Sequence, residues 1–264
     1  EIDFTRLPSR KVIYKFTDEI IDLLFPIEST FTYHYEVADE KQERLQRTLT
    51  EILQPLTSRY ALDVPEIVTQ FFCFLPGIYN NLIADARFFL KSDPAAESVE
   101  EVIIAYPGFY AITVYRMAHE LAKLNVPIVP RVITEYAHNK TGIDIHPGAT
   151  IGSPFFIDHG TGVVIGQTTI IGNNVRIYQG VTLGALAVRH EATGEKRHPT
   201  IEDDVIIYAG SCILGGDTIV GRNSVIGGNV WLVSSVPPLS MVYHKSDVVI
   251  RDKSEMNQVV DFVI

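Results

Sequence analysis

Residues 152–166, with the sequence GSPFFIDHGTGVVIG, hold a carboxylate and an imidazole side by side, Asp158 and His159. An imidazole beside a carboxylate is a pair of residue types that can carry acid–base or binding chemistry. Gly160 and Gly162 follow, and glycines tolerate the backbone angles of a bulge. The segment therefore predicts a functional site. An ordinary exposed histidine in a tolerated insertion is the alternative interpretation.

A second group of polar residues lies in residues 184–200, with the sequence GALAVRHEATGEKRHPT. Arg197 and His198 stand at its end, immediately before a regular pattern resumes. Functional side chains concentrate on loops that a rigid scaffold holds in place. We therefore expect residues 184–200 to form an extruded loop with a binding role.

The elements that must position these residues follow a six-residue repeat from residue 143 onward. Such hexapeptide repeats are typical of parallel β-helices, in which three hexads, about 18 residues, make one triangular coil. The repeat is broken twice, by an eight-residue spacing around His159 and by residues 184–200. We expect the repeated apolar side chains to point inward at Ile145, Ile151, Ile157, Ile165, Ile171, Ile177, Leu183, Ile201, Ile207, Ile213, Ile219, Val225 and Trp231.

The first part of the chain has a different pattern, with apolar residues three and four positions apart. The chain is therefore predicted to combine an α-helical domain, residues 1–140, a β-helix domain, residues 141–240, and a C-terminal tail, residues 241–264. This is an α+β fold class.

Composition excludes several classes of function. The formal net charge of the 264 residues is −10 and no long basic run occurs, which argues against nucleic-acid and anionic-membrane partners. No apolar run is long enough for a membrane span, and no signal peptide is evident. The two cysteines fit no metal or disulfide framework. We expect a cytoplasmic protein.

Several separated motifs occur in the order found in one known family. The chain reads DPAA and YPGFYAITVYRMAHEL, then TGIDIHPGATIGSPFFIDHGTGVVIG, YQGVTLGA, KRHPTI and IIYAGSCILGG. From about residue 82 to about residue 236 it resembles serine acetyltransferase. The resemblance implies a left-handed β-helix, a homotrimer or a dimer of trimers, and acetyl transfer from acetyl-CoA to L-serine in cysteine biosynthesis. It makes the helical domain the oligomerisation domain and the β-helix the catalytic domain. It also implies feedback inhibition by cysteine and no metal.

The same resemblance assigns roles to individual residues. His159 matches the family's catalytic base and Asp144 the aspartate that orients it. The pocket for the acceptor amino acid matches Asp93, Asp158, Arg197 and His198, and the acetyl-CoA groove matches the backbone around Gly184, Ala185, Ala209 and Gly210. An acceptor with an ammonium and a carboxylate suits two aspartates and one arginine.

The chain departs from the family's pattern in three places. Tyr110 replaces a common histidine, the loop 184–200 is longer and lacks a GG run after Leu183, and a GVPAK segment that helps to bind the coenzyme is absent. The tail NQVVDFVI nevertheless resembles the family's isoleucine-terminated ends, which implies that Ile264 docks into cysteine synthase.

Other functions stay open on the sequence alone. The same chemistry on phosphoserine, homoserine or a sugar is one alternative, because Arg189, His190 and Lys196 add cations to the loop. A non-enzymatic scaffold that binds a partner is another. A zinc-dependent β-helix enzyme would need a close histidine pair, and no H-x₄-H spacing is present among the histidines of the repeat region.

Overall fold

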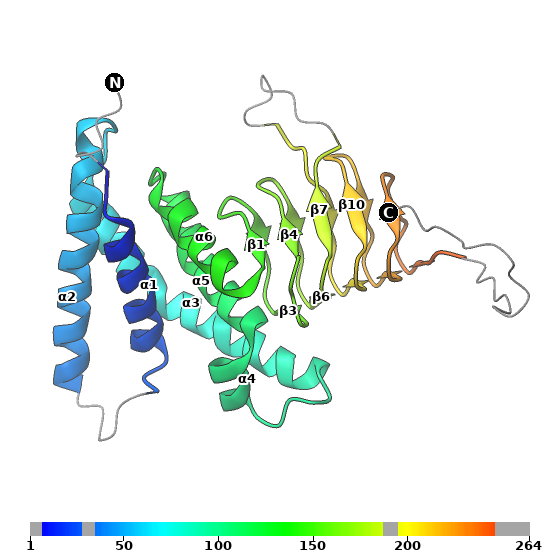
Figure 1. The fold of residues 1–264 in the computed structure, drawn as a ribbon, viewed down its shortest axis with the longest axis horizontal. Helices are drawn as coiled ribbons and strands as arrows, with labels where there is room; N and C mark the ends of the chain where they lie inside the picture. The colour runs from blue at the N-terminus through cyan, green and yellow to red at the C-terminus, as the bar shows by residue number, and fades with distance from the viewer. Residues whose placement is uncertain (1–6, 28–34, 187–194, 246–264) are drawn as a thin grey trace, which may run out of the picture.

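The computed structural model describes residues 7–27, 35–186 and 195–245. Helices occupy its first part and gather at one end of a long stack of strands (Figure 1). In chain order the helical elements are α1 (Arg10–Leu24), α2 (Tyr35–Leu53), the 3-10 helix η2 (Gln54–Ser58), α3 (Val64–Ser92), α4 (Val99–Ala105), α5 (Pro107–Lys123) and α6 (Val129–Thr141).

Local sequence signals set the helix ends. The carboxylate of Asp63 accepts a hydrogen bond from the Glu66 N–H and caps α3, and the hydroxyl of Ser98 caps α4 in the same way. Gly142 ends α6 with a φ of 71°, the left-handed conformation that glycine adopts without a steric penalty. The chain therefore leaves α6 directly into the first strand.

Helix α3 is the core helix of this part. By length and composition it is apolar enough to cross a membrane. It contacts α2, α4, α5 and strand β3, and Phe71, Leu82 and Phe89 are completely buried. Its apolar character therefore serves packing on several sides.

The strands form three parallel sheets that the chain visits in turn, which is the topology of a parallel β-helix. The fold class predicted from the hexads is confirmed. Sheet A contains β1 (Asp144–Ile145), β4 (Val164–Ile165), β7 (Thr182–Gly184), β10 (Cys212–Leu214) and β13 (Trp231–Leu232). Sheet B contains β2 (Thr150–Ile151), β5 (Ile170–Ile171), β8 (Thr200–Ile201) and β11 (Ile219–Val220). Sheet C contains β3 (Phe155–Ile157), β6 (Val175–Ile177), β9 (Ile206–Ile207), β12 (Val225–Ile226) and β14 (Met241–Val242).

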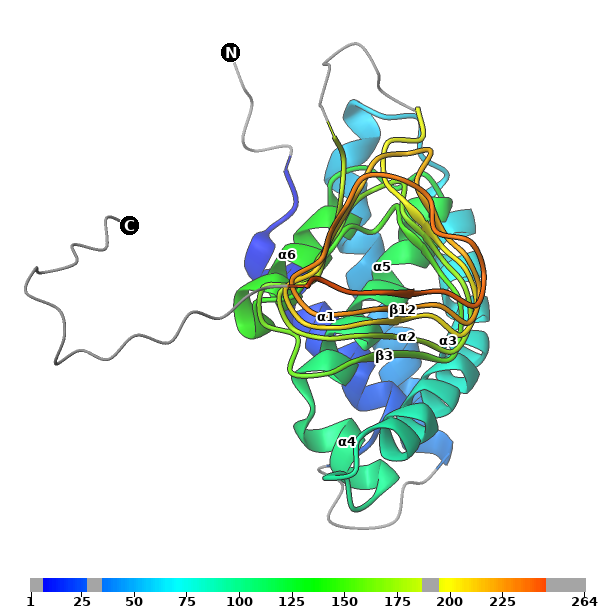
Figure 2. The same cartoon turned by 90° about the vertical axis from the view of Figure 1, so that its right-hand side faces the viewer.

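Two corners of the coil carry the predicted site residues, and Figure 2 looks along the stack so that successive coils superimpose. The first corner joins sheet A to sheet B, and the third corner joins sheet C back to sheet A. At the third corner Gly162 and Gly180 have φ of 78° and 71°. A Cβ on Gly162 would lie 3.6 Å from the Gly180 Cα, so left-handed residues are stacked one above another.

The predicted inward register is correct as far as Ile213 and wrong beyond it. Ile219 and Trp231 are 43% and 66% exposed, whereas the neighbouring Val220 and Ile226 are completely buried. The turn after β10 contains one extra residue, accommodated at Gly215 with a φ of 103°. Because side chains alternate between the two faces of a strand, one extra residue shifts the inward-facing position by one residue along the chain, from Ile219 to Val220.

A buried ion pair fastens the helices to the first coil. Arg116 of α5 donates to both carboxylate oxygens of Asp85 of α3, at 2.7 and 2.9 Å. The guanidinium also donates to the carbonyl of Gly152 at 2.9 Å, and the Phe155 N–H donates to Asp85 at 2.9 Å. Burial raises the pKa of Asp85, and the adjacent guanidinium opposes that rise. Donors and acceptors from α3, α5 and the first coil therefore meet at one point.

Substitution of Asp85 with Asn should lower the free energy of unfolding by about 3–5 kcal/mol, because it leaves the charge of Arg116 buried and unpaired. The matched control is Glu19→Gln, which breaks the more exposed pair with Arg44 and should cost less than about 1 kcal/mol. Urea unfolding followed by circular dichroism measures both values. Equal losses in the two variants would contradict the anchoring role of the buried pair.

Candidate active site

His159 lies in the bulge at the third corner of the first coil. Its φ is 54°, unusual for a residue other than glycine, and Gly160 continues the left-handed turn with a φ of 81°. The side chain is 70% exposed, and its Nε2 lies 3.7 Å from Oδ1 of Asp158. The interruption of the coil therefore exposes the His159 imidazole to solvent, with the Asp158 carboxylate beside it.

The backbone around Asp144 is hydrogen-bonded to the bulge. The Asp144 N–H donates to the carbonyl of Val163 at 2.9 Å, and the Gly162 N–H donates to the carbonyl of Gly142 at 2.8 Å. The carboxylate contacts Arg131 of α6 instead of the imidazole, with Oδ1 at 3.5 Å from Nη1. The structure thus brings the two predicted catalytic segments together, and in the described residues no hydrogen bond joins the two side chains.

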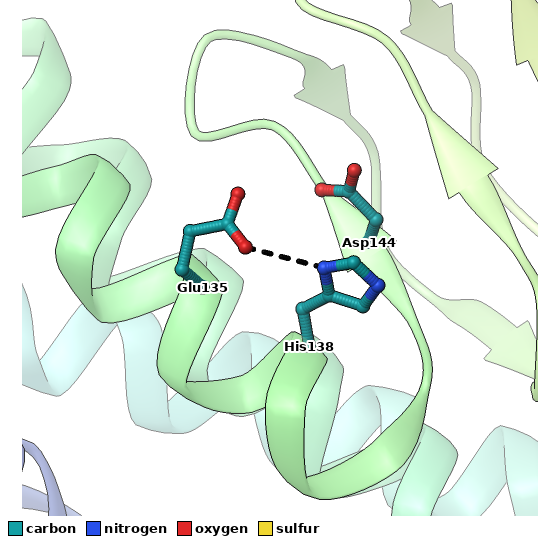
Figure 3. Close-up of side chains that lie close together, drawn as sticks. All are labelled: Glu135, His138 and Asp144. Atoms are coloured by element: carbon teal, nitrogen blue, oxygen red, sulfur yellow. Dashed lines mark hydrogen bonds and ion pairs between the residues drawn. The ribbon is translucent and has the colours of Figure 1, made fainter.

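Asp144 belongs to a charged cluster with Glu135 and His138, shown in Figure 3. One ligand atom from each of the three lies within 4.8 Å of the others, a spacing that a metal ion would accept. Arg131, however, forms ion pairs with both carboxylates, and His138 Nδ1 lies 3.2 Å from Glu135 Oε2. The guanidinium therefore already supplies the positive charge between the carboxylates. Sequence reasoning missed this cluster, for which the i, i+4 spacing of Arg131 and Glu135 was the available signal.

Asp93 stands at the C-terminal end of α3. Its Oδ1 accepts the Ala95 N–H at 2.8 Å, and its Oδ2 accepts the Tyr106 hydroxyl at 2.8 Å. A hydrogen bond to Asp93 raises the pKa of Tyr106 to about 12, together with burial and the charges of Asp93, Glu101 and Asp158. The carboxylates of Asp93 and Asp158 also raise the pKa of Tyr178, after burial. Asp93 and Asp158 therefore both lie near enough to Tyr106 and Tyr178 to act on their hydroxyl groups.

Arg197 and His198 lie at the first corner, a different edge of the coil. The Thr168 N–H donates to Nδ1 of His198 at 3.1 Å, and the Thr168 hydroxyl accepts the Arg197 N–H at 2.9 Å. Burial lowers the pKa of His198 to about 4, with help from the charges of Arg197 and Lys196. His198 is therefore neutral at neutral pH, and because Nδ1 accepts a hydrogen bond, its remaining ring proton is on Nε2.

The predicted base, acceptor-pocket and acetyl-CoA residues thus fall into two groups. The third corner carries Asp158, His159, Ala209 and Gly210, with Asp93 beside it, and the first corner carries Gly184, Ala185, Arg197 and His198. Among the described residues, no hydrogen bond or ion pair joins one group to the other. The proposed acidic half-site, Asp93 and Asp158, and the proposed basic half-site, Arg197, therefore lie at separate edges of one chain.

Aromatic residues that sequence reasoning missed lie directly above Asp158. Tyr178 and Tyr208 stack with ring centroids 5.0 Å apart and an interplanar angle of 19°. Each occupies the position after an inward apolar residue, as Asp158 does after Ile157. That shared register was the signal that could have identified them.

Comparison with known proteins gives the class and the family. No family model matches the chain. It is 43% identical to a plasmid-encoded serine acetyltransferase of Synechococcus elongatus, over 90% of this chain and 82% of that protein. It is 50% identical to the serine acetyltransferase of Bacillus subtilis, over 62% of this chain and 73% of that protein.

Solved structures agree with the sequence relatives. Serine acetyltransferase isoform 3 of Entamoeba histolytica, in complex with cysteine, has a TM-score of 0.79 and 34% identity, covering 90% of this chain and 85% of that one. The Neisseria gonorrhoeae serine acetyltransferase in complex with serine has a TM-score of 0.62 and 28% identity, covering 89% and 95%.

These likenesses define a left-handed β-helix acyltransferase that depends on acetyl-CoA. The chain belongs to the serine acetyltransferase family. The predicted reaction, transfer of the acetyl group of acetyl-CoA to the hydroxyl of L-serine to give O-acetylserine and CoA, is confirmed by this membership.

Proposed function

We propose that His159 is the general base of this reaction and that a homotrimer completes the site around it. The observation that carries the proposal is the exposed imidazole in the bulge, beside the Asp158 carboxylate. His159 takes the serine hydroxyl proton as the oxygen attacks the thioester carbonyl. The imidazolium then returns the proton to the CoA thiolate as the tetrahedral intermediate collapses.

In this proposal the Asp144 carboxylate, which contacts Arg131 in the structure, turns toward the imidazole and orients it. The backbone contact between Asp144 and the bulge supports the role, since the two segments are hydrogen-bonded at adjacent positions. A carboxylate behind the ring also stabilises the imidazolium that forms during attack.

Asp93 and Asp158 bind the ammonium of the acceptor, and Arg197 and His198 bind its carboxylate. Because these two pairs lie at different edges of the coil, we propose that the first corner of a neighbouring subunit meets the third corner of this one. Cyclic symmetry repeats that contact three times in a homotrimer, and two trimers then pair into a hexamer. The triangular cross-section of the coil and the opposite charges of the two half-sites support this arrangement.

Acetyl-CoA lies along the same subunit boundary in the proposal. Gly184 and Ala185 at one corner, and Ala209 and Gly210 at the other, offer backbone groups to the amide-rich pantetheine arm. Proton transfer by His159 requires no metal, and we expect none. The free thiols of Cys73 and Cys212 fit a cytoplasmic enzyme.

His159→Ala should lower kcat by roughly 100-fold or more, because the general base is lost. The side chain is exposed, so the thermal midpoint should stay near that of the unchanged protein. Release of CoA thiol is the measurement, and circular dichroism is the control for folding. Turnover close to normal in this variant would remove His159 from the mechanism.

Serine should be the preferred acceptor in a panel that includes phosphoserine, homoserine and sugars. Lys196, which would otherwise attract a phosphate, donates to the carbonyl of His198. Cysteine carries the same ammonium and carboxylate as serine, so it should inhibit competitively with serine. A different preferred acceptor, or no inhibition by cysteine at millimolar concentration, would contradict the proposed pocket.

Ile264 lies outside the described residues, and its docking into cysteine synthase is a proposal from the sequence. The terminal carboxylate imitates an amino-acid substrate, and an extended apolar segment supplies contact area. Removal of residues 262–264 should abolish co-purification with cysteine synthase and leave acetyl transfer unchanged. Retained binding by the shortened chain would refute the proposal.

A further inference from the structure

The hydroxyl of Tyr106 is hydrogen-bonded to Asp93, next to the predicted binding site for the acceptor's ammonium. We propose that Tyr106 is a positioning residue, which fixes the Asp93 carboxylate in the orientation that receives this ammonium. The inference rests on the proposed role of Asp93 and extends it to a residue that has no assigned role.

The geometry fixes both oxygens of Asp93. Ala95 N–H donates to Oδ1 and Tyr106 Oη donates to Oδ2, each at 2.8 Å. One donor on each oxygen stops rotation of the carboxylate, while every oxygen keeps a second lone pair for a ligand. Without the phenol, only the backbone contact would orient the group.

A phenol suits this position better than a cation would. An arginine or lysine on Asp93 would neutralise its charge and compete with the ammonium of the acceptor. Tyr106 donates one hydrogen bond and adds no charge. Because its pKa is raised to about 12, it stays protonated at neutral pH. Asp93 also lies at the C-terminal end of α3, where the helix dipole adds to the attraction for a cation.

The phenol is rigidly linked to the bulge that carries His159. Tyr106 precedes Pro107, the first residue of α5, and its ring meets Phe89 edge-on at 6.0 Å. Two residues after Tyr106, a Cβ on Gly108 would lie 2.2 Å from the carbonyl oxygen of Ile157. The start of α5 therefore touches the strand that leads into Asp158 and His159. The hydrogen bond from Tyr106 then holds Asp93 at a fixed position relative to this strand.

The test is Tyr106→Phe, which removes only the hydroxyl. It should raise KM for serine by about 10-fold, the size expected for a lost hydrogen bond to a charged group, and leave KM for acetyl-CoA within about twofold. The matched control is Tyr110→Phe in the first turn of α5, whose hydroxyl contacts Lys140 at 3.1 Å and Asp18 at 3.5 Å instead of Asp93. The control should change neither constant.

A double-mutant cycle with Asp93→Asn separates the inference from the proposed function. If Tyr106 acts through Asp93, its substitution should have no further effect on serine KM in a protein that already carries Asp93→Asn. An unchanged serine KM in Asp93→Asn alone would refute the proposed role of Asp93. A raised KM in Asp93→Asn but not in Tyr106→Phe would overturn this inference only. Additive effects, or equal rises in both KM values, would also overturn it, because they indicate a structural role.

Discussion

The buried ion pair between Asp85 and Arg116 is the interaction on which the arrangement of the rest depends. The pair also binds the backbone of the first coil at Gly152 and Phe155, so it fixes α3 and α5 against the β-helix. The end of α3 carries Asp93, and Tyr106 immediately precedes α5. A single desolvated contact therefore places two residues of the helical part beside the bulge, because neither charge can be left unpaired inside the protein.

The β-helix contributes rigidity, and the proposed site residues lie where its repeat is interrupted. The bulge presents His159 outward, and residues 184–200 end in Arg197 and His198 at another edge. Regular coils between these interruptions hold the two groups apart at a fixed spacing. The acidic half-site at the third corner and the basic half-site at the first corner are complementary to each other, and both are complementary to a zwitterionic amino acid. That complementarity between separate edges is the reason for assigning the complete site to neighbouring subunits.

Much of this organisation could be predicted from the sequence, because the hexads and their breaks are local patterns. The inward register held as far as Ile213. It failed from Ile219 onward, since one extra residue at Gly215 fits a turn without a visible change in composition. Tyr106 and Arg131 escaped prediction for another reason. Their partners, Asp93 and Asp144, lie thirteen residues away, and contact between them depends on how the helices and the first coil meet.

Complementation between two inactive variants tests the shared site most directly. His159→Ala removes the base from the third corner and Arg197→Ala removes the guanidinium from the first, so each homogeneous protein should be inactive. If each site combines the third corner of one subunit with the first corner of the next, randomly mixed trimers from equal co-expression should hold about a quarter of their sites intact. Recovery of about a quarter of the normal activity is the predicted result. Mixed trimers as inactive as the two parent variants would contradict the account.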